Sequence, residues 1–157
     1  MAGVPTRIGL ISDTHGLVRP QALEWLRGSD RIVHAGDICD ASVLETLGAI
    51  APLTAVRGNN DVGPWARQLR ETELLEIEGV RLLVIHDLAQ LGTAARDMQA
   101  HVVVSGHSHK PLVRRDGDVL FVNPGSAGPR RFKLPISVGE LLVDGASVQA
   151  RTIELPA

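Results

Sequence analysis

The residues of this chain that are best suited to bind metal ions gather in five short segments. Four of its six histidines fall in them, together with several carboxylates. The segments are Asp13-Thr14-His15, Gly36-Asp37, Gly58-Asn59-Asn60-Asp61, Ile85-His86-Asp87 and Gly106-His107-Ser108-His109. Carboxylate and imidazole together suit divalent transition ions such as Mn, Fe, Zn and Ni. The sequence therefore indicates a metal site assembled from well-separated parts of the chain.

Each of the five segments follows an apolar run rich in Val, Ile or Leu. These runs cover residues 8–11, 31–33, 53–56, 82–85 and 102–104. Such runs are typical of buried strands, and open α/β sheets bind ligands beyond the carboxyl ends of their strands. In an extended segment, side chains two positions apart point the same way. We therefore expect Asp13 and His15 to share one small volume, and His107 and His109 to do the same.

The number of these candidate ligands exceeds what one ion needs if it also binds water. Two ions would use all of them, and an anion between two cations reduces their mutual repulsion. Asp37 stands alone after Gly36 and is the natural bridging ligand, while Asn59 offers a neutral oxygen. Two ions about 3.5–4 Å apart can activate a shared water and hold the oxygens of a phosphate ester during in-line displacement.

Length and composition predict one ordinary domain over residues 1–157. A net charge of −2 gives no reason to expect nucleic acid as a partner. Cys39 has no second cysteine to pair with, which suits a reducing compartment, and we expect it to be a small buried residue. No signal-peptide core or membrane-length apolar run is evident, so a cytoplasmic protein without membrane contact is expected.

The order of the predicted elements suggests two sheets. Strands are expected over residues 8–11, 31–34, 53–56, 74–78, 80–85 and 102–105. Helices are expected from Pro20 to about Arg27, from Asp40 or Ser42 to about Leu47, and from near Thr93 to before His101. Asp116-Gly117 and Asp144-Gly145 predict hairpins. The first half thus alternates strand and helix, the second half is mainly antiparallel hairpins, and helices cover the outer faces of the strand–helix part.

The five segments, in this order, resemble the motifs of the calcineurin-like metallophosphoesterases. The family pattern is D-x-H, GD, GN-x-D or GN-x-E, a lone His after a strand, and GH-x-H. The resemblance is strongest to the small single-domain phosphodiesterase branch of bacteria and archaea. The flanking Ser12-Asp13-Thr14-His15-Gly16 and Asn123-Pro124-Gly125-Ser126 are typical of that branch.

The resemblance implies an α/β fold, a four-layer α/β/β/α sandwich of two mixed sheets. It implies that a metal-bridging hydroxide attacks the phosphorus, with Asp37, Asn59 and His107 as the catalytic residues. The cofactors would be two divalent ions, Mn first, with Ni, Fe, Zn or Mg as alternatives. The implied ligands are Asp13, His15 and His109 for one ion, Asn59, His86 and His107 for the other, and Asp37 for both.

Two positions depart from the family pattern. Larger members carry a His after the ligand Asn, thought to assist the leaving group, but Asn60 stands there and cannot act as an acid near pH 7. Asp87 stands where Gly usually follows the lone His. Its carboxylate either hydrogen-bonds to a ligand His or faces solvent.

The sequence predicts a binuclear metal-dependent phosphoesterase acting on small phosphate esters. Phosphodiesters come before monoesters, because no catalytic His follows Asn59. The alternatives are a protein-binding scaffold, as in the retromer subunit related to this branch, and a nucleotide-binding module without turnover. An exposed edge strand would allow a homo-oligomer, either dimer or tetramer.

Several other residues carry predictions of their own. A structural role is expected for His34, and His101 is given no catalytic role. Asn123 and Ser126 either orient ligands or only form a turn. The pair Arg130 and Arg131 attracts phosphate or is simply solvated, and the sequence leaves these alternatives open.

Overall fold

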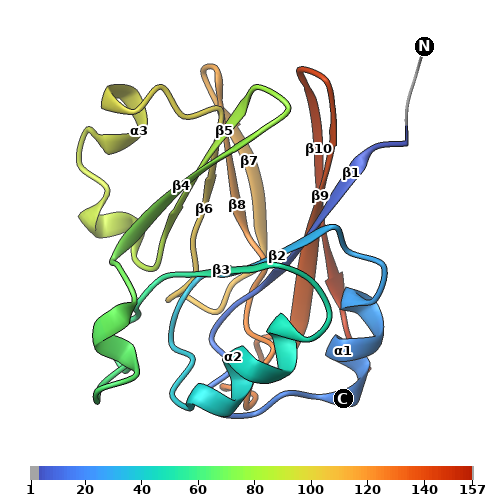
Figure 1. The fold of residues 1–157 in the computed structure, drawn as a ribbon, viewed down its shortest axis with the longest axis vertical. Coiled ribbons are helices and arrows are strands. Elements are labelled where there is room, and N and C mark those ends of the chain that lie inside the picture. Colours follow the sequence, from blue (N-terminus) through green and yellow to red (C-terminus); the bar gives the residue numbers. More distant parts are fainter. Residues whose placement is uncertain (1–3, 157) are drawn as a thin grey trace.

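The computed structural model describes residues 4–156 as two five-stranded sheets that face each other (Figure 1). The first sheet has the order β10-β9-β1-β2-β3. Its strands are β1 (Thr6–Ile11), β2 (Arg31–His34), β3 (Leu53–Ala55), β9 (Ser137–Asp144) and β10 (Ser147–Glu154). Strands β1, β2 and β3 are parallel, and the β9–β10 hairpin joins antiparallel to β1.

The second sheet has the order β4-β5-β6-β8-β7. Its strands are β4 (Thr72–Ile77), β5 (Val80–Ile85), β6 (Val102–Val104), β7 (Leu112–Asp116) and β8 (Val119–Asn123). The strand pairs β4–β5 and β7–β8 are hairpins, but β6 runs parallel between β5 and β8. The description of the second half as mainly antiparallel was therefore incomplete. The three valines of β6 are all buried, as a parallel strand covered on both faces requires.

The helices agree with their local signals, with one exception. Helix α1 (Pro20–Leu26) begins with its proline, and α2 (Ala41–Gly48) is capped by Asp40, whose side chain accepts from the Ser42 N–H. Helix α3 is only Ala94–Asp97, shorter than predicted. It has no buried residue to hold a longer helix in place, and Gln99 already has a φ of +53°. Short 3-10 turns are η1 (Ala66–Gln68) and η2 (Leu88–Gln90).

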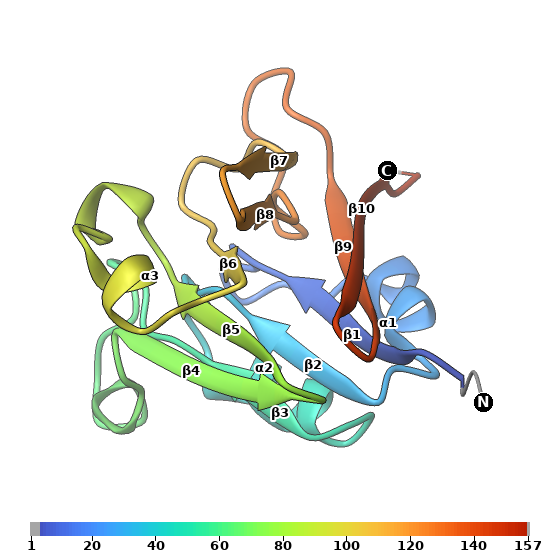
Figure 2. The same cartoon turned by 90° about the horizontal axis from the view of Figure 1, so that it is seen from above.

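Three apolar cores separate four layers, which confirms the predicted α/β/β/α sandwich. The central core lies between the two sheets and includes Leu10, Val84 and Val104. A second core packs α1 and α2 against the outer face of the first sheet, and a third packs α3 against the second sheet. Figure 2 shows α1 and α3 on opposite sides of the sheets.

The parallel strands of both sheets deliver their following loops to one region of the molecule. Asp13 follows β1 and Asp37 follows β2, whereas His86 follows β5 and His107 follows β6. The central core keeps these strands in fixed register, so the loops after them are held by rigid elements. No helix within residues 4–156 is both long and apolar enough to span a membrane.

Candidate metal centre

The candidate ligands lie on loops with an unusual backbone. Positive φ angles occur at Asp13 (54°), His15 (47°), Asp37 (58°), His107 (72°) and His109 (62°). Non-glycine residues rarely adopt this left-handed region, and such strain concentrates at functional sites. The expectation that these segments are extended was therefore wrong. Their side chains are placed by turns, and contacts between loops hold these turns in shape.

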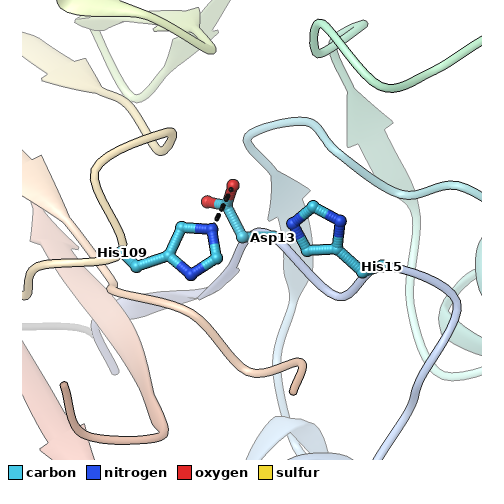
Figure 3. Close-up of side chains that lie close together, drawn as sticks. All are labelled: Asp13, His15 and His109. Carbon is cyan, nitrogen blue, oxygen red and sulfur yellow. Dashed lines mark ion pairs between the residues drawn. The ribbon is translucent and has the colours of Figure 1, made fainter. Parts of the chain in front are cut away.

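The first cluster contains Asp13, His15 and His109, whose ligand atoms all lie within 4.8 Å of one another (Figure 3). The Nε2 atom of His109 lies 3.3 Å from Asp13 Oδ1. Asp13 is fully buried, and its Oδ2 atom accepts from the Ser12 hydroxyl and from the His107 N–H. The other oxygen of Asp13 is thereby left facing the two histidines.

The second cluster forms around His86. Its Nδ1 atom lies 2.7 Å from the Ala35 carbonyl oxygen, which can only accept, so Nδ1 carries the proton. The Nε2 atom then presents its lone pair to Asn59 Oδ1 at 3.0 Å and to His107 Nδ1 at 3.3 Å. Several electron-pair donors therefore point into one volume.

Asp37 lies between the two clusters. Its Oδ2 atom is 3.7 Å from His15 Nε2 and 3.4 Å from His86 Nε2. A group of ligand atoms from Asp13, Asp37 and His86 also lies within 4.8 Å. The structure thus brings all seven predicted ligands together. It places His107 and His109 in different clusters, which is the division that the resemblance implies, whereas the two-residue spacing suggested that they share one volume.

The electrostatics of the centre are those of carboxylates surrounded by histidines. Burial raises the pKa of Asp37, but contacts from His86 and Asn60 outweigh it, and this pKa lies below its ordinary value. Burial lowers the pKa of His86, yet Asp37 more than compensates, so that pKa is raised. Burial also raises the pKa of Asp13, but hydrogen bonds from His109 and Ser12 outweigh burial, so this pKa lies below its ordinary value. The site therefore favours ionised carboxylates together with positive charge.

Asn60 and Asp61 hold the Asp37 loop from the outside. Asn60 donates to both oxygens of Asp37, from its backbone N–H and its side-chain amide, each at 2.9 Å. Asn60 therefore supports a candidate ligand. Asp61 is buried and accepts four backbone N–H groups, from Asp37, Ile38, Cys39 and Gly58. Sequence reasoning gave Asp61 no role, although its place in the third motif was the available signal.

Asn123 and Ser126 both position the site rather than only forming a turn. The Asn123 amide donates to the Gly106 carbonyl and the Ser108 hydroxyl, which ties down the loop that carries His107 and His109. The Ser126 hydroxyl donates to the Asp13 carbonyl at 3.0 Å.

The glycines of the motifs are required by close packing. A Cβ on Gly36 would lie 2.6 Å from His86 Nδ1, and one on Gly58 would overlap Asp37. A Cβ on Gly106 would meet the Ser12 hydroxyl. The candidate ligands are therefore packed directly against neighbouring backbone.

The remaining histidines have structural surroundings, whereas the cysteine lies beside a candidate ligand. His34 is fully buried, accepts from the Gly36 N–H and contacts the Thr14 hydroxyl, which fits the structural role predicted for it. His101 accepts from the Arg81 N–H and so links β5 to the start of β6. Cys39 was expected to be buried but is exposed, and its Sγ atom lies 3.6 Å from His15 Nδ1.

Two charged residues lie beside the candidate ligands. The Oδ2 atom of Asp87 is 3.8 Å from His107 Nε2, while its Oδ1 caps the turn η2 by accepting from the Ala89 N–H. Burial lowers the pKa of His15, the carboxylates oppose this, and the Arg131 guanidinium adds to the lowering.

Comparison with known proteins agrees with this geometry. The sequence profile described as the calcineurin-like phosphoesterase superfamily domain matches residues 6–145. The chain belongs to this superfamily. A probable metallophosphoesterase of Methanothermobacter thermautotrophicus is 35% identical over 162 aligned residues, which cover 96% of this chain and 93% of that protein.

Two solved structures show how far the likeness extends. A novel archaeal phosphodiesterase superposes with a TM-score of 0.79 at 25% identity, covering 95% of this chain and 99% of its own. Vacuolar Protein Sorting 29 from Cryptosporidium parvum superposes with a TM-score of 0.85 at 20% identity, covering 98% and 93%. The second likeness concerns the fold alone, so the fold by itself does not decide the function.

The superfamily implies divalent metal ions, and the donor set of this chain fits them. Within residues 4–156, the buried side-chain atoms that lack a hydrogen-bond partner are Asp13 Oδ1, His15 Nε2, Arg19 Nε and His109 Nδ1. Three of these four belong to the first cluster. Buried polar atoms are rarely left unpaired, and a cation among carboxylate and imidazole donors would satisfy Asp13 Oδ1 and His15 Nε2.

Proposed function

We propose that this protein is a binuclear metal-dependent phosphodiesterase, with residues 1–157 as one metallophosphoesterase domain. The observation that carries the proposal is the position of Asp37 Oδ2, 3.4 Å from His86 in one cluster and 3.7 Å from His15 in the other. A carboxylate oxygen between two groups of histidine donors suits two neighbouring cations.

In this proposal each cluster holds one ion. Asp13, His15 and His109 bind the first. Asn59, His86 and His107 bind the second, and Asp37 binds both. Mn is the first choice of metal, and Ni, Fe, Zn or Mg are alternatives, because all accept oxygen and imidazole ligands. When bound, the metal pair supplies an activated water and stabilises negative charge on phosphate oxygens.

The chain's own residues position these ligands. The Ala35 carbonyl fixes the His86 tautomer, so that Nε2 faces the site. Asn60 holds Asp37 through two hydrogen bonds. Because one of these bonds engages the Asn60 side-chain amide, and an amide is no acid near pH 7, the leaving group takes its proton from solvent. This favours esters whose leaving groups are stable as anions.

Phosphodiesters are the proposed substrates, in line with the described activity of the archaeal phosphodiesterase that resembles this chain. The alternatives are a protein-binding scaffold and a nucleotide-binding module. Both are less favoured, because a full set of ligands around Asp37 has no use in docking alone. The proposed location is the cytoplasm, as a monomer or small homo-oligomer.

The test is metal analysis combined with hydrolysis. Protein purified without chelator should hold close to two transition ions per chain, and it should cleave bis(p-nitrophenyl) phosphate when loaded with Mn. Asp37→Ala and His107→Ala should lose most of the activity and part of the bound metal. His101→Ala is the matched control and should retain both. Protein that holds two ions yet cleaves no ester in a broad panel would refute the hydrolase proposal.

A further inference from the structure

A pocket of about 350 Å³ opens beside His107, and His107 is the one proposed ligand in its lining. Its volume lies within the range of small-molecule sites. The side chains of Leu88, Pro111 and Leu112 form an apolar wall, with Leu112 39% exposed. His107 lines this pocket and also belongs to the second cluster, so the pocket adjoins the candidate centre at this side chain.

The charge beside this pocket is unusual for a site that binds phosphate. Asp87 lines the pocket, and its Oδ2 atom lies 3.8 Å from His107 Nε2. The Asp87 carboxylate is fixed in place, because Oδ1 accepts from the Ala89 N–H at 3.0 Å. Lys110 is the one cation in the lining of the pocket, and its side chain is exposed.

We infer that this pocket binds the ester group that stays on the phosphorus, and that it selects phosphodiesters whose retained group is apolar or aromatic. This inference rests on the proposed function and names the substrate class more closely. During hydrolysis the oxygen of water forms a new P–O bond, and the P–O bond to the leaving group breaks. The leaving group departs with the electron pair, and the retained group keeps its bond to phosphorus.

The same pocket disfavours phosphate monoesters for two reasons. A monoester carries a second negative charge near neutral pH, since its second pKa is about 6. In place of the retained group it would present a charged oxygen to the apolar wall of Leu88 and Leu112, which costs desolvation energy. That oxygen would also face Asp87, a like charge.

A series of three substrates with one leaving group isolates the retained group. The substrates are phenyl p-nitrophenyl phosphate, methyl p-nitrophenyl phosphate and p-nitrophenyl phosphate, all assayed with Mn-loaded protein. We expect kcat/KM for the phenyl diester to exceed that for the methyl diester by about tenfold. This factor is at the low end of the range for enclosed apolar pockets, because this pocket is open to solvent. The monoester should be the poorest substrate.

Two matched variants assign this preference to the pocket wall. Leu112→Ser should lower the phenyl-to-methyl ratio by about threefold or more. Val113→Ser is the control, because Val113 is the next residue of β7, is 43% exposed and does not line the pocket. A wild-type ratio near one, or equal effects of the two variants, would overturn the inference.

The charge selection is tested with Asp87→Asn, which retains the oxygen that caps η2. The ratio of monoester to methyl-diester turnover should rise by about fivefold. Because both rates are measured on one sample, a partial loss of metal cancels from the ratio. An unchanged ratio would show that Asp87 does not select against monoesters.

Binding without turnover separates this inference from the proposed function. Diphenylphosphinate and dimethylphosphinate carry one charge and no ester bond to hydrolyse, and their Kd values can be measured by calorimetry on Mn-loaded protein. The diphenyl compound should bind about tenfold more tightly, and Leu112→Ser should remove most of that difference. If the diphenyl compound binds in this way but no ester is hydrolysed, the pocket inference is supported and the proposed hydrolase function is refuted. If esters are hydrolysed but the diphenyl compound shows no such preference, the pocket inference is refuted and the proposed function stands.

Discussion

The carboxylate of Asp61 organises two of the five ligand loops, and Asp61→Asn tests this role. Asp61 Oδ1 accepts from the N–H groups of Ile38 and Cys39 at 2.8 Å each, and Oδ2 accepts from Asp37 at 3.0 Å and Gly58 at 2.7 Å. Asparagine keeps one oxygen and replaces the other with an NH₂ group. Two backbone donors would then face another donor.

The magnitude follows from the bonds that are lost. A hydrogen bond to a charged group contributes about 1.5–3 kcal/mol, so two of them amount to about 3–6 kcal/mol. This is a large part of the roughly 5–15 kcal/mol by which a domain is stable. Either orientation of the amide removes the acceptor of backbone donors in the loop that begins at Asp37, whose φ of +58° depends on such contacts. We therefore expect a large loss of stability and a loss of bound metal.

The assay is urea unfolding followed by circular dichroism on chelator-treated protein, so that metal binding does not contribute to stability. The bound metal is then measured separately after reloading with Mn. Asp40→Asn is the control: Asp40 is exposed, accepts one backbone N–H from Ser42, and asparagine caps a helix equally well. An Asp61→Asn protein within about 1 kcal/mol of wild type, with its full metal content, would refute the reasoning.

Three further predictions concern residues around the two sheets. Glu140→Gln should lower the free energy of unfolding at pH 7 by about 2 kcal/mol, because the buried Glu140 carboxylate accepts from Arg7 and Arg151 at 2.6 Å each. Burial raises the pKa of Glu140, but the two arginines bring it below its ordinary 4.5, so this stabilisation should be lost as the pH falls below about 4.5 in urea titrations. Gly58→Ala should lower both stability and bound metal, because a Cβ there overlaps Asp37, whereas Gly48→Ala meets nothing within 4 Å. Burial lowers the pKa of His34 to about 4. As the pH falls below 6.5, the unfolded state therefore binds a proton at His34 while the folded state does not. Stability should therefore fall by about 3 kcal/mol between pH 6.5 and 4, and His34→Gln should flatten that part of the profile.

Each of these predictions has an outcome that contradicts it. A gap between wild type and Glu140→Gln that stays constant down to pH 3 would mean that Glu140 is not ionised in the pair. Equal stabilities and metal contents of Gly58→Ala and Gly48→Ala would remove the packing argument for the third motif. Parallel pH profiles for wild type and His34→Gln would show that His34 titrates normally in the folded protein.

Local sequence determined the elements and the identity of the polar residues at their ends. Pro20 and Asp40 begin helices as expected, and the turns at Gly117 and Gly145 close the predicted hairpins. These signals could be read because they act within a few residues: a fixed φ, a side chain that caps its own helix, or a turn that needs glycine. Burial can also be predicted from local sequence, as the run of three valines in β6 shows.

The conformation of the loops depends on contacts between distant segments. The Asp13 N–H bonds to the Gly36 carbonyl, and the Asp37 N–H bonds to Asp61, so the left-handed backbones of Asp13 and Asp37 are held by other loops. A pattern read along one segment contains no information about these partners. The prediction of extended backbone at Asp13 failed for this reason.

The sequence by itself was sufficient to predict a set of candidate ligands from residue types and their order along the chain, and the structure brings these side chains close together. Only the tertiary structure decided which way the side chains within one segment point. It sent His107 toward His86 and His109 toward Asp13, although the two histidines are two positions apart. It also placed the Cys39 thiol beside His15 and made Asp61 the common acceptor of two loops. The physical reason is that local patterns encode burial and chain direction, whereas the direction of a side chain on a loop is set by the neighbours that the packed sheets bring to it.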